Sequence, residues 1–286
     1  MKYLRFVKIE HTLFSLPIVF SGTFLALSLG QISSSIPWTQ ILWILLAVLG
    51  ARSAGFGMNR IIDKDWDAMN PRTKDREIPS QKISVRSAWI FVFVFSLLLL
   101  CAAGQLSKTC LYLSPIPLVL FLIYPFLKRK TIWSHLGLGV AWGIAPVGGW
   151  LAVSPEMSPL SDLKPVILLA LFCVFWVAGF DIVYALLDED FDRQNGLYSM
   201  PAVMGRKNAL RVSRIFHFIA ILFLGTLVEV YLKHPFSYLF LAVAGMLLIL
   251  SHWNVATKPL TPSVIDFAFF KVNAVLGFII FLLVLL

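Results

Sequence analysis

The sequence predicts an all-α protein that crosses a membrane many times, and two features of its 286 residues carry this prediction. The first is composition: 59% of the residues are hydrophobic and only 14% are charged, whereas soluble domains carry about 25% charged residues. The second is a series of apolar runs, each near the roughly 20 residues that a helix needs to cross a bilayer. We therefore expect the lipid bilayer to surround this chain.

Nine segments have the length and apolar character of transmembrane spans. Each must be helical, because the bilayer core offers no hydrogen-bonding partner to free backbone groups. Proline and glycine residues mark the connections between them. The expected spans are residues 12–29, 36–58, 86–104, 109–127, 134–153, 165–185, 209–231, 235–254 and 264–286. Since no separate soluble part is visible, we expect residues 1–286 to form a single transmembrane domain.

The basic residues predict the orientation of these spans. Twenty of the 24 Lys and Arg residues lie in the N-terminal segment or in the even-numbered connections, and only Lys108, Lys164 and Lys233 lie in the others. Basic loops stay in the cytoplasm, so the pattern predicts a multi-pass protein of a bacterial inner membrane, with its N-terminus inside and its C-terminus outside. The net charge of +9 thus reflects orientation, and we expect no nucleic-acid partner.

Ten of the 15 carboxylates gather in two clusters, which follow the second span and end the sixth. The first cluster contains Asn59, Asp63 and Asp67, at spacings i, i+4 and i+8. The second contains Asp181, Tyr184, Asp188 and Asp192, at spacings i, i+3, i+7 and i+11. On a helix, each set forms a stripe along one face. Both clusters fall on the predicted cytoplasmic side, so we expect the site to open there.

Aligned carboxylates repel one another and are costly near a membrane, so a cation should compensate them. Mg²⁺ is the best candidate, because it prefers oxygen ligands and substrate phosphates. Two stripes that face each other across a cavity could hold two such ions with a bridging diphosphate. Basic loop residues would neutralise the remaining charge: Arg72, Lys74, Arg76, Lys128 and Arg129. We expect Asp65, Glu189 and Asp190 to be ordinary solvated side chains.

Two other classes of membrane protein are alternatives to this interpretation. A divalent-cation transporter would also place carboxylates along a membrane cavity, but nearer the midplane, and it would not need the basic loops. A non-catalytic membrane scaffold would have no use for ten clustered carboxylates. The sequence therefore favours a metal–diphosphate site.

The paired motifs resemble the UbiA superfamily of intramembrane prenyltransferases. The resemblance rests on Asn59-x3-Asp63-x3-Asp67, Asp181-x2-Tyr184-x3-Asp188-x3-Asp192, Asn70-Pro-Arg-Thr73 with Arg76, and Tyr124-Pro-x2-Lys128-Arg129-x-Thr131. It implies nine transmembrane helices around a central cavity, Mg²⁺ and an isoprenyl diphosphate. It also implies that the metal–diphosphate is bound by Asn59, Asp63, Asp67, Asp181, Asp188 and Asp192, with Lys128 and Arg129 on the phosphates. The residues expected to be catalytic are Asp63, Asp67, Asp188 and Asp192.

Three further strings look like the quinone-pathway branch of this superfamily: Lys8 to Pro17, Arg76-Glu-Ile-Pro79, and Tyr184 to Arg193. They are most similar to the prenyltransferases of futalosine-type menaquinone synthesis, which are grouped with 4-hydroxybenzoate polyprenyltransferases. Glu10-His11-Thr12 replaces the Lys-Pro-hydroxyl stretch of the ubiquinone type. The resemblance implies transfer of a polyprenyl group to an aromatic carboxylic acid, either 1,4-dihydroxy-6-naphthoate or 4-hydroxybenzoate. Homogentisate, haem, chlorophyllide and a glycerol lipid remain alternative acceptors.

Arg52 is the most informative charge within a predicted span. It lies seven residues before Asn59 and so shares that stripe, one to two turns deeper; it could bind the acceptor's carboxylate or the diphosphate. In the ninth span, Asp266, Lys271 and Asn273 are further candidates for lining the cavity. Three histidines, His135, His217 and His252, have no ligand-like spacing, and the sequence assigns them no role.

Overall fold

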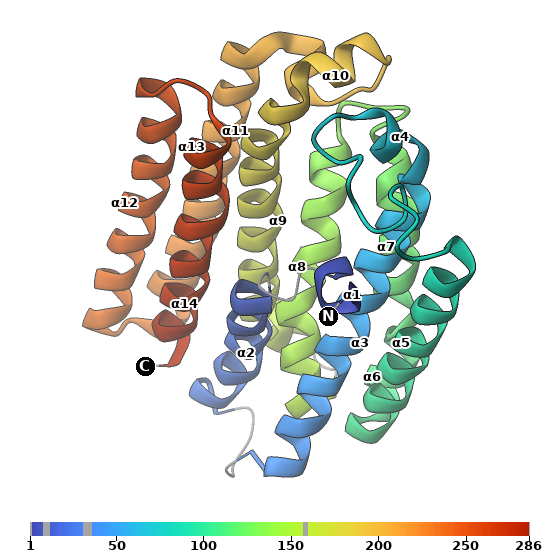
Figure 1. The fold of residues 1–286 in the computed structure, drawn as a ribbon. Helices are drawn as coiled ribbons and strands as arrows, with labels where there is room; N and C mark the ends of the chain where they lie inside the picture. Colours follow the sequence, from blue (N-terminus) through green and yellow to red (C-terminus); the bar gives the residue numbers. More distant parts are fainter. Residues whose placement is uncertain (1, 8–11, 31–35, 157–159, 286) are drawn as a thin grey trace.

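The computed structural model contains helices and no β-strand within the residues that it describes, 2–7, 12–30, 36–156 and 160–285. The prediction of an all-α protein is therefore confirmed (Figure 1). Residues 8–11 lie outside the described part, so the structure does not address the interpretations that rest on Lys8, Glu10 and His11.

The helices follow one another along the chain with short connections. Their bounds are α1 Lys2–Phe6, α2 Thr12–Ser28, α3 Trp38–Ile62, α4 Lys64–Met69, α5 Val85–Leu106, α6 Lys108–Leu113, α7 Pro115–Leu127, α8 Ser134–Val153, α9 Lys164–Ala185, α10 Glu189–Gln194, α11 Met200–Leu227, α12 Pro235–Thr257, α13 Pro262–Asp266 and α14 Val272–Leu285. Short 3₁₀ segments occupy Leu160–Leu163 and Leu186–Asp188. Single π-helical turns occupy Val228–Leu232 and Phe267–Lys271.

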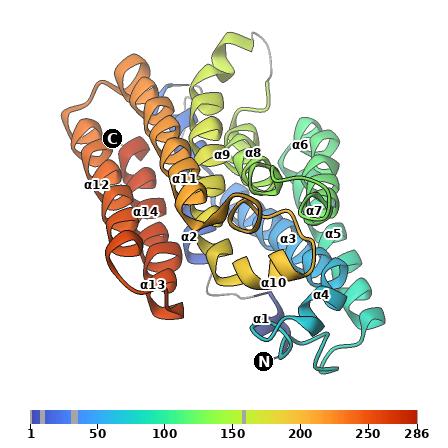
Figure 2. The ribbon, with the colours of Figure 1, turned by 90° about the horizontal axis from the view of Figure 1, so that it is seen from above.

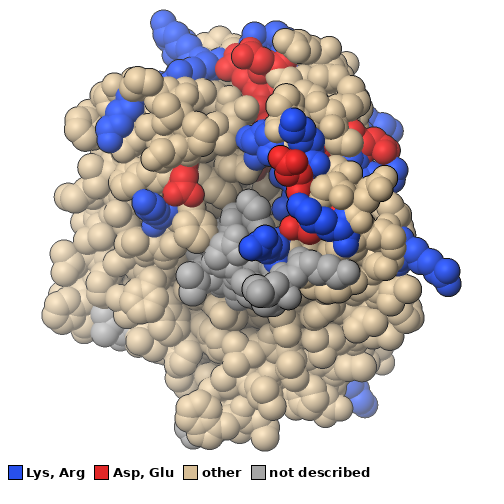
Figure 3. Space-filling view, viewed as in Figure 1, with Lys and Arg blue, Asp and Glu red and all other residues tan. Residues whose placement is uncertain are grey.

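Each of the nine predicted spans overlaps a helix or consecutive helical segments, and the ninth overlaps three: α13, a π-helical turn and α14. Within the described residues, eight helical runs are long and apolar enough to cross a bilayer, and the first span is a shorter apolar helix over Ser15–Ser28. The protein is an integral membrane protein. On the face shown in Figure 3, charged side chains gather towards the end that holds α4 and α10, while the lower half carries few charges.

Some boundaries differ from the prediction for identifiable reasons. Helix α11 begins at Met200, nine residues before the expected start; its backbone is kinked at Gly205 (φ 75°), and the polar residues 206–208 interrupt the apolar run at that point. The fourth span divides at Ser114 into α6 and α7, since Pro115 starts a new helix at that point. Helix α3 extends to Ile62, past the expected end at 58, and thereby carries Asn59 within the helix.

Seen from above, the long helices surround a central region (Figure 2). Helices α3, α5 and α7 pack together on one side, and α11, α12 and α14 lie on the other. Helices α8 and α9 pack on each other between these groups, and α2 packs against α8 and α14. The short helices α4 and α10, which carry part of the two acidic clusters, lie at the same end of the bundle (Figure 1).

Helices α2 and α8 approach each other so closely that their backbones are in contact. A Cβ atom added at Gly149 would lie 2.0 Å from the carbonyl oxygen of Val19, and one added at Gly22 would lie 1.8 Å from the carbonyl oxygen of Pro146. Thr23 Oγ1 donates a hydrogen bond to the Gly149 carbonyl oxygen at 2.9 Å. Small residues allow this kind of packing in membrane proteins, and here they hold α2 against α8.

We expect Gly149→Ala to destabilise the protein, because its methyl group would meet backbone atoms that cannot give way. Overpacking costs typically about 1–3 kcal/mol, which should appear as a lower melting temperature of the purified protein in detergent. Gly148→Ala is the matched control, since a Cβ at the neighbouring residue meets no atom within 4 Å. Equal melting temperatures for the two variants would contradict the close contact of α2 with α8.

Candidate active site

A cavity of about 570 Å³ runs between helices α2, α3, α5, α7, α8 and α9. Twelve of the residues predicted for the site line it: Arg52, Asn59, Asp63, Asp67, Arg72, Arg76, Lys128, Arg129, Asp181, Tyr184, Asp188 and Asp192. Lys74, the remaining basic loop residue expected there, is exposed and does not line the cavity. Away from these residues the lining is mostly apolar and includes Ile44, Leu99, Leu113, Phe121 and Trp142. The cavity therefore has a charged end, near α4 and α10, and an apolar remainder between the spans.

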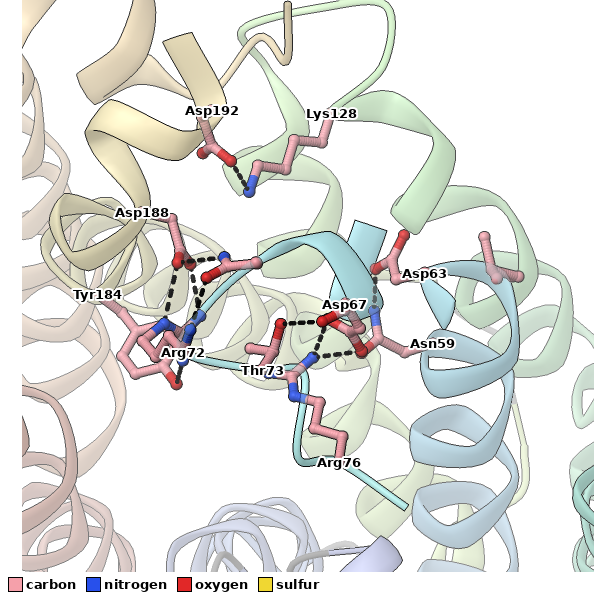
Figure 4. A network of polar contacts seen from close by, with 12 residues as sticks. Asn59, Asp63, Asp67, Arg72, Thr73, Arg76, Lys128, Tyr184, Asp188 and Asp192 are labelled. Atoms are coloured by element: carbon pink, nitrogen blue, oxygen red, sulfur yellow. Dashed lines mark hydrogen bonds and ion pairs between the residues drawn. The ribbon is translucent and has the colours of Figure 1, made fainter. Parts of the chain in front are cut away.

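The first acidic cluster lies where α3 ends and α4 begins. The chain passes between the two helices at Asp63 without losing the four-residue spacing. The backbone N–H of Asp63 donates to the carbonyl oxygen of Asn59 at 2.9 Å, and that of Asp67 donates to Asp63 at 2.7 Å. The side chains consequently stay close together, and Asn59 Nδ2 donates to Asp63 Oδ2 at 3.0 Å (Figure 4).

The second cluster spans the end of α9, the 3₁₀ segment and α10. Arg72 joins two of its members, because Nη1 donates to Tyr184 Oη at 2.8 Å and Nε donates to Asp188 Oδ1 at 2.9 Å. Asn70 Nδ2 also donates to Asp188 Oδ1, at 2.8 Å. The side chain of Asp192 is fully buried on α10 and lies 2.8 Å from Lys128 Nζ. The two clusters face each other across the cavity (Figure 4).

Four basic side chains each pair with one carboxylate. From the loop between α4 and α5, Arg76 Nη1 contacts both carboxylate oxygens of Asp67, at 2.6 and 2.7 Å, while Arg72 crosses to Asp188. From the end of α7, Lys128 pairs with Asp192, and Arg129 Nη2 lies 3.2 Å from Asp63 Oδ1. The sequence predicted that these basic residues would face phosphate. In the structure they compensate the carboxylates directly.

Burial and neighbouring groups shift the pKa of one residue in each of two pairs. Burial and the neighbouring carboxylate of Asp67 raise the pKa of the Asp63 carboxyl above its ordinary value, although the hydrogen bond from Arg129 opposes this. Burial alone would lower the pKa of Arg72, but its hydrogen bonds to Asp188 and Tyr184 outweigh that effect and raise it. The charge of Asp63 is therefore incompletely compensated, and a further cation beside it would be favourable.

One residue to which the sequence assigned no role, His135, lies in the site. Its Nδ1 is 2.7 Å from Asp181 Oδ2, and its Nε2 is 3.2 Å from the backbone N–H of Met200. Because Nε2 accepts from Met200, the proton of a neutral ring lies on Nδ1 and is donated to Asp181. His135 is separated from these partners by 46 and 65 residues, so no local spacing could have revealed the contact.

Arg52 lies deeper in the cavity, as its position in the stripe predicted. Its Nη1 donates to the carbonyl oxygen of Val7 at 3.4 Å, and its guanidinium lies over the ring of Phe56, 4.6 Å from the centroid. It thus contacts the N-terminal segment as well as the cavity.

The prediction that polar residues of the ninth span line the cavity was wrong. Lys271 and Asp266 are exposed, and Asn273 is buried, where it accepts a hydrogen bond from Trp176 Nε1 at 2.8 Å. This part of the chain contributes Phe269 to the lining instead. A π-helical turn occupies Phe267–Lys271, between Asp266 and Asn273.

Of the three acidic residues expected to be solvated, Asp65 and Asp190 are exposed, whereas Glu189 has only 18% of its side chain exposed. The side chain of Asp65 is 81% exposed and pairs with the neighbouring Lys64, and Asp190 is also exposed. Glu189 forms a helical-surface ion pair with Arg193, at 2.6 Å. These residues belong to the same two helices as the site but do not line the cavity.

The oxygen-rich end of the cavity suits a hard divalent cation, since carboxylate and amide oxygens are ligands that Mg²⁺ prefers. Among the described residues, no group of three or more His, Cys, Asp or Glu lies close enough together to hold a metal. Mg²⁺ commonly takes one or two carboxylates, several waters and substrate phosphates. The residues therefore fit a metal that binds together with a diphosphate rather than one held by protein ligands alone.

A membrane-embedded cavity with a charged, oxygen-rich end and an apolar remainder defines an integral membrane enzyme for substrates with a polar head and an apolar tail. The chain belongs to the UbiA prenyltransferase family, whose model matches residues 15–283. It is accordingly a prenyltransferase rather than a transporter or a scaffold.

Several relatives resemble most of the chain. A 4-hydroxybenzoate octaprenyltransferase of Pectobacterium atrosepticum is 30% identical over 86% of this chain and 83% of its own length. A 4-hydroxybenzoate solanesyltransferase of Synechocystis is 30% identical over 83% of this chain and 79% of its own. Both comparisons extend across the two acidic clusters and most of the helical bundle.

Solved structures show the same fold. The apo structure of a UbiA homologue from Aeropyrum pernix is 33% identical and covers 95% of this chain and 96% of its own, with a TM-score of 0.84. A UbiA homologue from Archaeoglobus fulgidus, bound to GPP and Mg²⁺, covers all of both chains with a TM-score of 0.72. At 19% identity, the second likeness concerns the fold alone.

Proposed function

We propose that the protein transfers a polyprenyl group from a polyprenyl diphosphate to an aromatic carboxylic acid, 1,4-dihydroxy-6-naphthoate or 4-hydroxybenzoate, and that it requires Mg²⁺. The observation that carries the proposal is the pair of acidic clusters at one end of a cavity whose remainder is apolar. A diphosphate head suits the first part and a polyprenyl tail suits the second. The similarity to a 4-hydroxybenzoate octaprenyltransferase and a 4-hydroxybenzoate solanesyltransferase supports an aromatic acid as acceptor.

Ten of the twelve predicted site residues fall into two groups in this proposal. Asn59, Asp63, Asp67, Asp181, Asp188 and Asp192 would hold the metal–diphosphate, and Arg72, Arg76, Lys128 and Arg129 would contact its phosphate oxygens. When bound, Mg²⁺ supplies charge stabilisation to the departing diphosphate. His135 donates a hydrogen bond to Asp181 and so orients that carboxylate towards the cavity.

In the proposed reaction, one bond of the donor breaks and one bond to the acceptor forms. The allylic C–O bond of the prenyl diphosphate breaks, an electron-rich ring carbon of the acceptor forms the new C–C bond, and loss of the ring proton restores aromaticity. The basic side chains stabilise the negative charge that develops on the leaving group. The apolar lining, with Phe121 and Trp142 among its residues, excludes water from the cationic prenyl group.

The placement in the membrane is also part of the proposal. The distribution of Lys and Arg supports a cytoplasmic N-terminus in a bacterial inner membrane, with the charged end of the cavity open to the cytoplasm. We propose that residues 1–286 form one prenyltransferase domain, since the described cavity is lined by residues from Ser15 to Phe269.

The test is an in-vitro transfer assay with purified protein, a polyprenyl diphosphate and Mg²⁺, in which the two acids are offered separately. Product formed with the naphthoate alone would establish an enzyme of menaquinone synthesis, the outcome that the sequence resemblance favours. Product formed with the benzoate alone would assign the protein to ubiquinone synthesis. Folded protein that prenylates neither acid would overturn the proposal and direct attention to homogentisate, haem, chlorophyllide or glycerol-lipid acceptors.

A further inference from the structure

Helix α11 carries three basic side chains on one exposed face, away from the cavity described above. Lys207, Arg211 and Arg214 are exposed, and none of them lines the cavity. Their spacing of i, i+4 and i+7 places them on the same face of the helix, over about two turns. They form a positive surface, the α11 basic face, that the proposed active site does not use.

The cations of the α11 basic face have only neutral partners. Arg211 Nη1 donates to the amide oxygen of Asn208 at 3.2 Å, and Arg214 Nε donates to the carbonyl oxygen of Leu210 at 3.2 Å. None of the three basic residues forms an ion pair with the part of the chain that the structure describes. Like charges three and four residues apart on a helix repel one another, so an anion beside them would be favourable.

Helix α12 adds to this positive surface. Arg206, next to the α11 basic face, donates through Nη2 to the carbonyl oxygen of Val255 at 3.1 Å. That contact joins the start of α11 to the end of α12, which the exposed Lys258 follows directly. Helix α10 also packs against α11, but its Glu189 already pairs with Arg193. Basic side chains of two helices therefore lie at the same end of the bundle.

The same face of α11 continues as an apolar surface. Phe218 and Leu222 follow Arg214 four and eight residues further along the helix, and they are 63% and 53% exposed. The three cations extend over about 10 Å of the helix axis, which is comparable with one headgroup layer of a bilayer, about 5–8 Å thick. A charged segment of this length followed by an apolar one matches the headgroup and the acyl chains of a phospholipid.

The α11 basic face presents two guanidinium groups and one ammonium group. Guanidinium groups bind phosphate oxygens through paired N–H donors, and basic residues at a membrane surface attract anionic lipids. A zwitterionic headgroup carries an ammonium that these cations repel. We propose that the α11 basic face binds the headgroup of an anionic phospholipid of the surrounding bilayer, with its acyl chains along Phe218 and Leu222. The inference uses only the placement in a membrane and is independent of the proposed function.

The experiment measures lipid binding to the purified full-length chain in a neutral detergent, with bound lipids counted by native mass spectrometry. Phosphatidylglycerol and phosphatidylcholine with identical acyl chains are titrated separately. We expect the wild type to prefer phosphatidylglycerol, and Lys207→Gln/Arg211→Gln/Arg214→Gln to bind it roughly 100-fold more weakly, because each cation near an anionic lipid strengthens binding about fivefold. Binding of phosphatidylcholine should not change. Added salt should weaken the binding of phosphatidylglycerol to the wild type, since it screens exposed charges.

Two controls separate a local site from the effect of net charge and from structural damage. Lys108→Gln/Lys164→Gln/Lys233→Gln removes three exposed cations from the opposite end of the bundle, and it should bind phosphatidylglycerol as the wild type does. The single variant Arg214→Gln, which makes the smallest change to the fold, should weaken that binding about fivefold. Since the substituted side chains are exposed, all these variants should melt at the wild-type temperature when no lipid is added.

Three outcomes would overturn the inference. Equal binding of the two lipids by the wild type would show that the protein does not select an anionic headgroup. Unchanged binding of phosphatidylglycerol in the triple α11 variant and in Arg214→Gln would place the lipid elsewhere on the protein. An equal loss of binding in the triple α11 variant and in the triple lysine control would show that only the net charge matters. Prenyl transfer by the wild type would stand in all three cases.

Discussion

Asp188→Asn should lower the turnover of prenyl transfer on the order of 1,000-fold, the scale expected when a charged group that stabilises the transition state is lost. The substitution keeps the shape of the side chain but removes the charge that binds Arg72 and accepts from Asn70. In the proposed site, it also removes one metal ligand. Asp63→Asn should have a comparable effect from the opposite cluster, since Asp63 is paired with Arg129 and bonded to Asn59.

The chain provides matched controls for both substitutions. Asp190→Asn and Asp65→Asn remove the same charge two residues away, from exposed side chains that do not line the cavity. Turnover would be measured under saturating donor and acceptor, and folding would be checked by gel filtration and melting temperature in detergent. Near-normal turnover in folded Asp63→Asn and Asp188→Asn would show that the metal–diphosphate assignment is wrong.

Removal of divalent metal should abolish transfer without unfolding the protein. The loss of activity is expected because a departing diphosphate needs cationic stabilisation. The fold should survive because Arg72, Arg76, Lys128 and Arg129 already compensate four of the carboxylates. A structural metal site would behave differently, since its binding free energy contributes to folding.

The measurement pairs a transfer assay with a melting curve, each recorded in EDTA and after Mg²⁺ is restored. We expect no product in EDTA, recovery of turnover with excess Mg²⁺, and a melting temperature that changes little when donor is absent. Full activity in EDTA would contradict the requirement for a divalent metal. A large fall in melting temperature on chelation alone would contradict the neutralisation of the carboxylates by basic side chains.

Much of the fold and of the candidate site was accessible from the sequence because the signals are local. Apolar runs of fixed length specify spans, and a four-residue spacing keeps Asn59 and Asp63 together even where α3 gives way to α4. The gathering of both clusters at one end followed from the positions of the spans. The number of spans between the two motifs therefore predicted that both would lie at the same end of the bundle.

The remainder depends on contacts between distant parts of the chain. His135 meets Asp181 only because α8 and α9 pack side by side. In the ninth span, Asp266 and Lys271 are exposed, and Phe269 lines the cavity instead.

At the charged end of the cavity, four carboxylates are already paired with Arg72, Arg76, Lys128 and Arg129. A charged ligand that binds there would exchange partners with these ion pairs. If a metal–diphosphate binds there as proposed, the carboxylates would exchange one cationic partner for another, and the basic groups would exchange carboxylate for phosphate. The total charge would then change little, and each of these groups would keep a partner of opposite sign before and after. Loading such a site in a medium of low dielectric constant would therefore avoid the large desolvation penalty of an unpaired charge.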